Sequence, residues 1–237
     1  MKLIYVITVM ILMVTHPLTV AEEQVSVRFG LMGFAPHSKI DPVTGECTGT
    51  ALENVRELFK DEKVSFIPVC AAPARTYRNV KDGIVDLSVN IKSTAAIAGA
   101  VTFSSYPMDE LAINFYSVAN VTEGPKTVAS VRGYDYNGQR EAFTKQGYIF
   151  VDVPNTSDAI RLFFNKRTRY LMSYEGPYIA FIENDKNFLK HKARLTPNSV
   201  ETKKLLAVPT FYAISKASDK HDFLVSLFDK VQKTPKQ

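Results

Sequence analysis

The sequence contains few of the residue patterns that mark enzymes and metalloproteins. Its 237 residues include only two cysteines. The histidines after residue 21, His37, His191 and His221, are isolated in the chain and show no metal-ligand spacing. No Gly-x-Ser-x-Gly motif, glycine-rich phosphate loop or paired-cysteine metal site is present. We therefore predict no metal site, no cofactor and no enzymatic activity, while the plentiful carboxylates leave an acid–base enzyme open as an alternative.

A broad basic surface is also missing. The formal net charge is +5, and the basic residues are scattered along the chain apart from Lys166, Arg167 and Arg169. A protein that tracks nucleic-acid phosphates needs a wider basic stripe than this short cluster. We interpret the cluster as the solvated end of a helix and predict no nucleic-acid partner.

Long apolar runs are confined to the N-terminus. Lys2 is followed by an almost wholly apolar stretch from Leu3 to Val14, and Thr19-Val20-Ala21 matches a small-x-small cleavage site. This pattern predicts a secretory signal over residues 1–21. The alternative, a membrane anchor, would need about 20 apolar residues. No cysteine follows the cleavage site, so a bacterial lipid anchor is not supported, and we expect a soluble, exported protein that begins at Glu22.

The two cysteines, Cys47 and Cys70, both lie in the predicted mature chain. An even number of cysteines in an oxidising compartment favours a disulfide. Cys47 precedes the first predicted helix and Cys70 follows the second predicted strand, so both should lie at the same edge of neighbouring strands. We predict a Cys47–Cys70 disulfide, and a catalytic thiol is the alternative.

Strand and helix patterns alternate through the mature chain. With 237 residues and 46% hydrophobic content, the chain is long enough to bury a sizeable core. Strands are predicted over 25–31, 64–69, 84–91, 111–118, 127–131, 148–151, 170–174 and 205–214. The last predicted helix carries an apolar stripe of Phe223, Leu224, Leu227, Phe228 and Val231. The alternation predicts an α/β fold with right-handed crossovers and mainly parallel sheets.

The stretch 73–107 contains the most specific motifs. Pro73 and Arg75 begin a predicted helix, Gly83 supplies its left-handed cap, and Gly83 to Asp86 form a G-x-x-D motif. A buried strand and the segment Phe103-Ser104-Ser105-Tyr106-Pro107 follow. This ordered set resembles the periplasmic solute-binding proteins of the amino-acid-binding type, bacterial extracellular solute-binding protein family 3. The resemblance covers most of the chain after residue 24.

The resemblance implies a two-lobed fold of type II, in which each lobe is a mainly parallel sheet flanked by helices. The break over residues 122–125 marks the crossing into the second lobe, and the strand over 205–214 marks the return. We therefore expect lobe 1 over residues 22–117 and 205–237, and lobe 2 over residues 118–204. Such a hinge lets a protein close around a small molecule.

The resemblance also implies a position for the ligand, because open α/β folds bind ligands at the carboxyl ends of their strands. The candidates in lobe 1 are Phe34 after the first strand, Arg75 for an anionic group, and Asn90, Ser93 and Thr94 around the end of the third strand. The candidates in lobe 2 are Tyr134 and Tyr136 after a glycine turn, Thr156 at a helix start, and Tyr174 at a strand end. Structural alternatives remain open: a core-capping Phe34, an Arg75 that pairs with a loop, a tyrosine-rich surface turn and a simple helix N-cap.

Two positions depart from the family pattern. Members that bind α-amino acids place an arginine six residues before the Phe-Ser pair to hold the carboxylate, and this sequence has Ile97 there. They hold the ammonium group with an aspartate after a second-lobe strand, where the match is Tyr174, followed by Glu175. An apolar Ile97 cannot replace a guanidinium fork. We therefore do not expect α-amino acids to bind in the usual manner.

Three functional hypotheses follow. The first is an exported, periplasmic, monomeric solute-binding protein that closes on a small molecule and delivers it to an ABC transporter permease or a membrane sensor. The second is a periplasmic enzyme similar to the dehydratases that share this fold, because the amino-acid ligands are missing. The third is a module that binds another protein, which a cleft blocked by its own side chains would favour.

Overall fold

The computed structural model describes residues 24–41, 43–118 and 124–232. The predicted signal sequence, residues 1–21, lies outside these ranges, and so do residues 119–123, which include the start of the predicted interlobe break. Within the described ranges, no helix has both the length and the apolar character required to cross a membrane.

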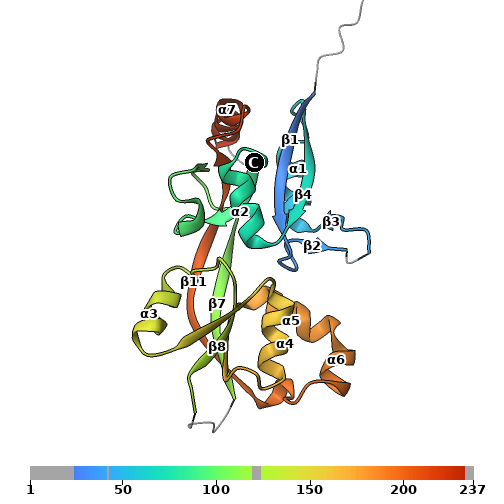
Figure 1. Cartoon of the computed structure of the whole chain (residues 1–237). Coiled ribbons are helices and arrows are strands. Elements are labelled where there is room, and N and C mark those ends of the chain that lie inside the picture. Colours follow the sequence, from blue (N-terminus) through green and yellow to red (C-terminus); the bar gives the residue numbers. More distant parts are fainter. Residues whose placement is uncertain (1–23, 42, 119–123, 233–237) are drawn as a thin grey trace, which may run out of the picture.

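The described residues form one nine-stranded sheet and a separate two-stranded hairpin. Strands in the large sheet follow the order β4-β1-β5-β11-β7-β10-β8-β9, and β6 pairs with β11 (Figure 1). Their bounds are β1 Val25–Met32, β4 Val64–Ala71, β5 Leu87–Ile91, β6 Val101–Phe103, β7 Asp109–Val118, β8 Thr127–Val131, β9 Ile149–Val153, β10 Tyr170–Tyr174 and β11 Val200–Ser215. The hairpin consists of β2 Lys39–Ile40 and β3 Cys47–Thr48.

Helices flank the sheet at both ends of the molecule. The α-helices are α1 Thr50–Leu58, α2 Pro73–Lys81, α3 Gln139–Lys145, α4 Thr156–Phe164, α5 Glu175–Asn184, α6 Lys186–His191 and α7 His221–Gln232, and single 3-10 turns lie at η1 Ala95–Ile97 and η2 Pro197–Ser199. The predicted α/β fold is confirmed, and each predicted strand is present. The hairpin, β6 and α6 were not predicted, because such short elements carry little periodicity.

The first lobe is built on β1, which pairs in parallel with β4 on one side and β5 on the other. Its core contains the apolar faces of α1 and of α7, the last helix of the chain. The rings of Phe59 and Phe228 meet edge to face with centroids 4.9 Å apart. The last helix therefore packs back on the first lobe as predicted, through Leu224, Leu227, Phe228 and Val231, whereas Phe223 of the predicted stripe is exposed.

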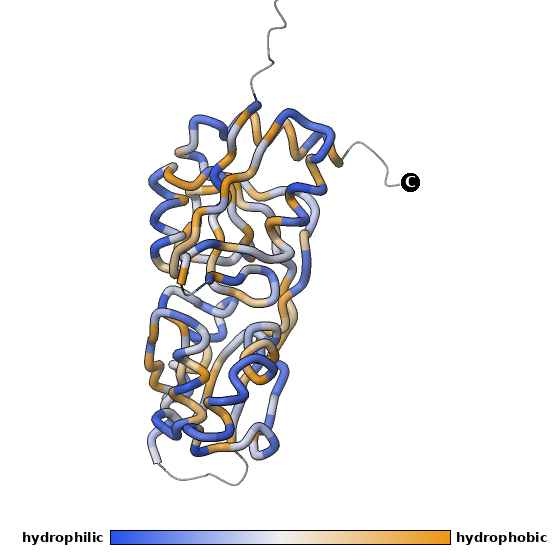
Figure 2. The backbone as a smooth tube through the Cα atoms, turned by 90° about the vertical axis from the view of Figure 1, so that its right-hand side faces the viewer, coloured by the Kyte–Doolittle hydropathy of each residue, from blue (hydrophilic) through white to orange (hydrophobic). Residues whose placement is uncertain are grey.

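The second lobe is built on β8, which pairs in parallel with β9 and β10. The amphipathic helix α4 buries Ala159, Ile160, Phe163 and Phe164 against this lobe. Asn155 caps α4, because its side-chain oxygen accepts a hydrogen bond from the backbone N–H of Asp158 at 2.9 Å. Figure 2 shows the two lobes stacked along the long axis of the molecule.

Two long antiparallel strands, β7 and β11, connect the lobes (Figure 1). They are paired from Val118 opposite Val200 to Asp109 opposite Thr210. From Thr210 onward β11 lies beside β5 of the first lobe, and residues 113–117 of β7 pair on their other edge with β10 of the second. The chain thus crosses between the lobes twice, and the two crossing strands lie side by side.

The G-x-x-D motif holds the first lobe together. Gly83 has φ +69°, and a Cβ at this position would lie 2.4 Å from the carbonyl oxygen of Ala217, so only glycine fits. The fully buried Asp86 accepts hydrogen bonds from Nη2 of Arg28 at 2.5 Å and from Oγ of Ser218 at 2.6 Å. The motif therefore ties α2, β1 and the segment before α7 to one another.

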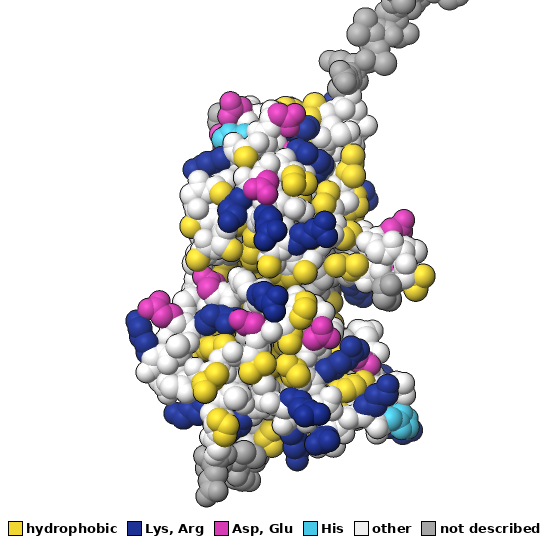
Figure 3. All heavy atoms as spheres, in the orientation of Figure 1, with side chains coloured by type: hydrophobic (Ala, Val, Ile, Leu, Met, Phe, Trp, Pro, Cys, Tyr) yellow, Lys and Arg dark blue, Asp and Glu magenta, His cyan; other side chains and the backbone are white. Residues whose placement is uncertain are grey.

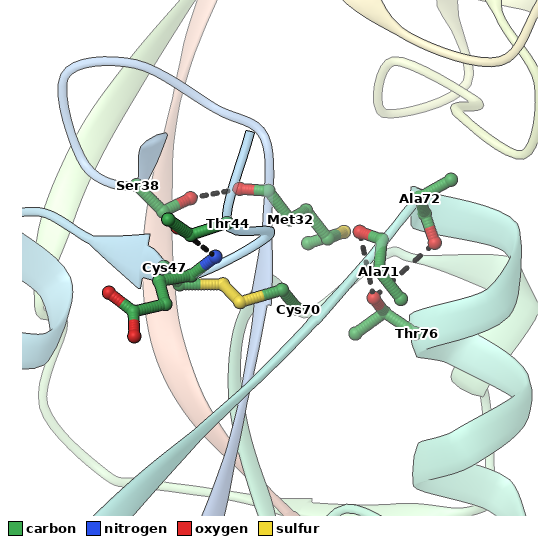
Figure 4. Close-up of a disulfide and its surroundings, with 9 residues drawn as sticks. Met32, Ser38, Thr44, Cys47, Cys70, Ala71, Ala72 and Thr76 are labelled. Atoms are coloured by element: carbon green, nitrogen blue, oxygen red, sulfur yellow. Dashed lines mark hydrogen bonds between the residues drawn. A yellow bond between two sulfur atoms is a disulfide. The ribbon is translucent and has the colours of Figure 1, made fainter. Parts of the chain in front are cut away.

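The predicted disulfide is present between Cys47 and Cys70, whose Cα atoms are 5.9 Å apart. Cys47 lies in the β2–β3 hairpin, and Cys70 lies near the end of β4 (Figure 4). The bond fixes the hairpin to the sheet beside the loop that follows β1. The side chain of Ser38 in that loop donates a hydrogen bond to the Met32 carbonyl.

Candidate ligand-binding cleft

A small cavity lies at the meeting point of the two lobes. Its volume is about 70 Å³, and it is lined by Gly30, Leu31, Met32, Phe34, His37, Ser38, Ala51, Tyr77, Val89, Asn90, Ile91, Thr94, Met108, Leu111, Tyr134, Tyr174 and Thr210. The first lobe contributes the carboxyl ends of β1 and β5 and one face of α2. The second lobe contributes the residues that follow β8 and the end of β10. The cavity therefore lies where α/β folds place their ligands.

Aromatic rings from both lobes surround the cavity. Phe34 of the first lobe meets Tyr174 of the second edge to face, with ring centroids 5.1 Å apart. Tyr174 in turn lies 5.6 Å from Tyr134 and 5.5 Å from Tyr136, measured between centroids. Tyr77 of α2 is buried with them in a single apolar cluster. The protein's own rings therefore meet one another across the boundary between the lobes.

The tyrosines around the cavity are held neutral. Burial raises the pKa of Tyr77, Tyr134 and Tyr174 well above the usual value of 10.0, and the neighbouring phenols add to the effect. The Tyr136 hydroxyl accepts a hydrogen bond from the backbone N–H of Val131 at 3.1 Å. The buried hydroxyl of Tyr134, by contrast, has no hydrogen-bond partner among the described residues. A ligand with an acceptor or donor atom would supply one.

Among the residues that the structure describes, no arginine, lysine, aspartate or glutamate lines the cavity. His37 is its one imidazole, and Nδ1 of His37 lies 3.5 Å from a carboxylate oxygen of Asp109. The polar groups are otherwise hydroxyls and one amide, from Ser38, Asn90, Thr94, Thr210 and the tyrosines. A bound ligand would therefore meet aromatic faces and neutral hydrogen-bonding groups.

The structure divides the predicted site residues into two groups. Five of them line the cavity: Phe34, Asn90, Thr94, Tyr134 and Tyr174. Four lie away from its lining: Arg75 and Ser93 are exposed, Tyr136 is fully buried behind Tyr134, and Thr156 lies at the start of α4. Arg75 lies instead in a second groove, on the outer side of α2.

Sequence reasoning did not identify Tyr77 as a site residue. Tyr77 follows Arg75 by two positions on α2, and a two-residue step turns a helix by about 200°. The buried positions of α2 are Pro73, Thr76, Tyr77 and Val80. This helical pattern was the available signal, since it places Tyr77 and not Arg75 on the inner face.

The structure shows the surroundings of the two positions that depart from the family pattern, Ile97 and Tyr174. Ile97 is fully buried in the apolar cluster, so it offers no polar group to a ligand. Tyr174 lines the cavity with its ring. The neighbouring Glu175 is exposed and does not line the cavity, and its carboxylate accepts a hydrogen bond from the amide of Asn114 at 3.5 Å. Among the described residues, no charged side chain lines the cavity in place of either family ligand.

No protein-family model matches the sequence, and no curated protein sequence matches it. Solved structures do match. A histidine kinase sensor domain with similarity to periplasmic binding proteins has a TM-score of 0.68 and 16% identity, covering 88% of this chain and 89% of that chain. An ancestral arginine-binding protein bound to arginine has a TM-score of 0.69 and 16% identity, covering 87% and 90%.

A substrate-binding protein of an ABC uptake transporter from Streptococcus pneumoniae, with bound histidine, also matches. Its TM-score is 0.67 at 13% identity, covering 87% of this chain and 85% of that chain. These similarities establish the fold of the chain, which is the two-lobed, type II periplasmic-binding-protein fold.

Proposed function

We propose that this protein is an exported solute-binding protein that closes on a small, uncharged, flat molecule and presents it to a membrane transporter or sensor. The observation that supports the proposal most directly is the cavity between the lobes, whose described lining is mainly apolar, includes the rings of Phe34, Tyr134 and Tyr174, and contains no arginine, lysine, aspartate or glutamate. Each lobe contributes part of that lining, so that closure completes the site.

The proposal includes how the lobes move. A cavity of about 70 Å³ is smaller than the roughly 150 Å³ that accommodates benzene in a protein core. The lobes must therefore separate before a ligand enters and close on it afterwards. We propose that the hinge lies where β7 and β11 pass from one lobe to the other, at residues 109–112 and 207–210. From Ile113 onward, β7 pairs with the second-lobe strand β10.

We expect ordinary α-amino acids to show no calorimetric binding to the mature protein. A zwitterion would leave both its charges unpaired in this cavity, which costs several kcal/mol. Uncharged flat molecules with one hydrogen-bonding group, such as nicotinamide, uracil, phenol and indole, form the second half of the same panel, and we expect at least one of them to bind. Micromolar binding of any amino acid would contradict the predicted ligand class.

A pair of tyrosine variants tests whether the ligand lies in this cavity. Tyr134→Phe removes the unpartnered hydroxyl and should weaken a ligand that bonds to it by about tenfold. Tyr106→Phe is the matched control. Tyr106 also has a buried hydroxyl without a hydrogen-bond partner among the described residues, but it packs against the first-lobe core that contains α1 and α7. Equal effects of the two variants would show that the ligand is elsewhere. Mass spectrometry of small molecules that co-purify with exported protein would identify the natural ligand.

We expect Gly176→Leu to hold the lobes apart. A Cβ on Gly176 in the second lobe would lie 3.2 Å from Cδ of Pro36 and 3.3 Å from the carbonyl oxygen of Ala35 in the first. A leucine side chain is larger than the space at this contact. We expect the lobes to rotate apart about the hinge, because that movement leaves the packed cores unchanged. Small-angle X-ray scattering should show a larger radius of gyration for Gly176→Leu than for the wild type. Ala142→Leu, at an exposed position of α3 without a positive φ, controls for the added side chain, and an unchanged radius in Gly176→Leu would contradict lobe opening.

A protein-binding module is the second candidate function, and the filling of the cleft by Phe34, Tyr77, Tyr134 and Tyr174 favours it. A module of this kind would keep its lobes closed without a solute. Scattering would then show one closed form that no member of the ligand panel changes. The enzyme hypothesis receives less support, because no carboxylate lines the cavity.

A further inference from the structure

A second groove lies between the lobes, on the outer side of α2. Its volume is about 580 Å³, and it shares no lining residue with the central cavity. The first lobe contributes Arg75 and Arg78 of α2 and Asp82, which follows the helix. The second lobe contributes Arg132 and Pro154. The size lies within the range of small-molecule sites, roughly 300–1,000 Å³. The groove is thus a separate feature to which both lobes contribute.

Positive charge dominates this groove. Three arginines line it, against the single carboxylate of Asp82. Figure 3 looks onto this face and shows lysine and arginine side chains gathered over α2 and just below it, across the boundary between the lobes. Like charges that line one groove repel one another, so an anion that neutralises them would be favoured.

In the part of the chain that the structure describes, no carboxylate forms a hydrogen bond or an ion pair with these three arginine side chains. Among the described residues, neither Arg75 nor Arg78 has a side-chain hydrogen bond or ion pair. Asp152 interacts electrostatically with Arg132. Its carboxylate already accepts hydrogen bonds from Arg140 at 2.8 Å and from Ser130 at 2.6 Å. The three guanidinium groups therefore keep their donors available for a ligand.

The backbone positions these arginines firmly. The Arg132 N–H donates to the Val153 carbonyl at 2.9 Å, which fixes the end of β8 beside β9. Arg75 lies in the first turn of α2, whose N-cap residue Ala72 also lines the groove. The groove extends along α2 to its C-cap residue Asp82, so both ends of the helix dipole border it and the positive field comes from the arginine side chains.

From these observations we propose that the groove binds a compact oxyanion of the phosphate type with two or more negative charges. Arginine forks match the oxygen geometry of phosphate and form paired, charge-assisted hydrogen bonds with it. Such an anion contacts Arg75 and Arg78 on one lobe and Arg132 on the other. The anion stabilises the closed arrangement of the lobes. By thermodynamic linkage it also raises the affinity of the central cavity for its ligand.

Calorimetric titration with inorganic pyrophosphate at about 0.15 M salt tests the proposal. We expect saturable binding by the wild type, and about tenfold weaker binding by Arg132→Gln and by the double variant Arg75→Gln/Arg78→Gln. The matched controls are Arg167→Gln and the double variant Arg167→Gln/Arg194→Gln, which remove equal charge from exposed positions of the second lobe. We expect the controls to bind like the wild type.

Several outcomes would overturn the proposal. These are the absence of saturable binding, equal weakening in groove and control variants, and undiminished binding by Arg132→Gln, which would show that one lobe suffices. Co-sedimentation with phosphatidylglycerol vesicles without any binding of pyrophosphate would identify a membrane surface as the partner and also overturn it. The titration contains no solute for the central cavity, so its failure would leave the proposed solute binding untouched.

Discussion

Replacing Asp86 with alanine is expected to destabilise the protein by about 3 kcal/mol, because it leaves Arg28 without its buried partner. Asp86 is fully buried and accepts hydrogen bonds from Nε of Arg28 at 2.9 Å, from the Arg28 backbone N–H at 2.7 Å and from Ser218 at 2.6 Å. The Arg28 side chain is 38% exposed, which screens part of the interaction and keeps the loss near the lower end of the range for buried pairs. Urea denaturation would measure the loss.

A neighbouring acid provides the control for this variant. Asp219 lies 3.8 Å from Arg28 but is 76% exposed, so Asp219→Ala should change the free energy of unfolding by less than about 0.5 kcal/mol. Equal effects of the two substitutions would contradict a structural role for the G-x-x-D motif.

The same carboxylate predicts a dependence of stability on pH. Burial alone would raise the pKa of Asp86, but hydrogen bonds from the Arg28 and Ser218 side chains and from the Arg28 backbone leave it below the usual value of 3.8. A lowered pKa in the folded state means that the stabilisation is present above pH 3.8 and is lost as the pH falls below it. In Asp86→Ala this part of the acid sensitivity should disappear.

Loss of the disulfide is expected to have an effect of similar size. Cys47 and Cys70 are 23 positions apart, and closing a loop of that length stabilises a protein by about 3 kcal/mol in the chain-entropy model. The double variant Cys47→Ser/Cys70→Ser should therefore unfold at a lower urea concentration than the wild type. Reduced wild-type protein should match the variant, whereas oxidised wild type should show no free thiol when denatured and labelled. Two labelled thiols per chain in the unreduced protein would contradict the bond.

The fold could be predicted well from the sequence, because it depends on patterns that can be recognised within short segments of the chain. The bounds of β10 agree with the predicted strand at both ends. The helix from Pro73 to a glycine cap is present as predicted, with Gly83 in the left-handed region. Apolar periodicity, a proline at a helix start and a glycine at its end are each encoded within a few residues.

The cleft was less predictable, because it depends on which side of each element faces the other lobe. Arg75 and Tyr77 belong to one short helix, and the packing of α2 turns Tyr77 inward and leaves Arg75 outside. Tyr134 and Tyr136 belong to one turn, yet Tyr134 lines the cavity while Tyr136, at φ 53°, is buried behind it. In α2 the helical spacing of the buried positions carried part of this information. In the turn with Tyr134 and Tyr136, the facing is set by contacts between residues far apart in the chain, which no local motif encodes.

The pairing of Asp109 with Thr210 has a consequence for how this chain could be rebuilt. The segment between these two residues leaves the first lobe and returns to it at adjacent positions in the sheet, which is the geometry of an inserted cassette. A second lobe with different cleft residues could therefore be grafted between the same two points without extending either connection. The first lobe would keep its fold across such an exchange, because β1, β4, β5, the end of β11 and α7 form their own core.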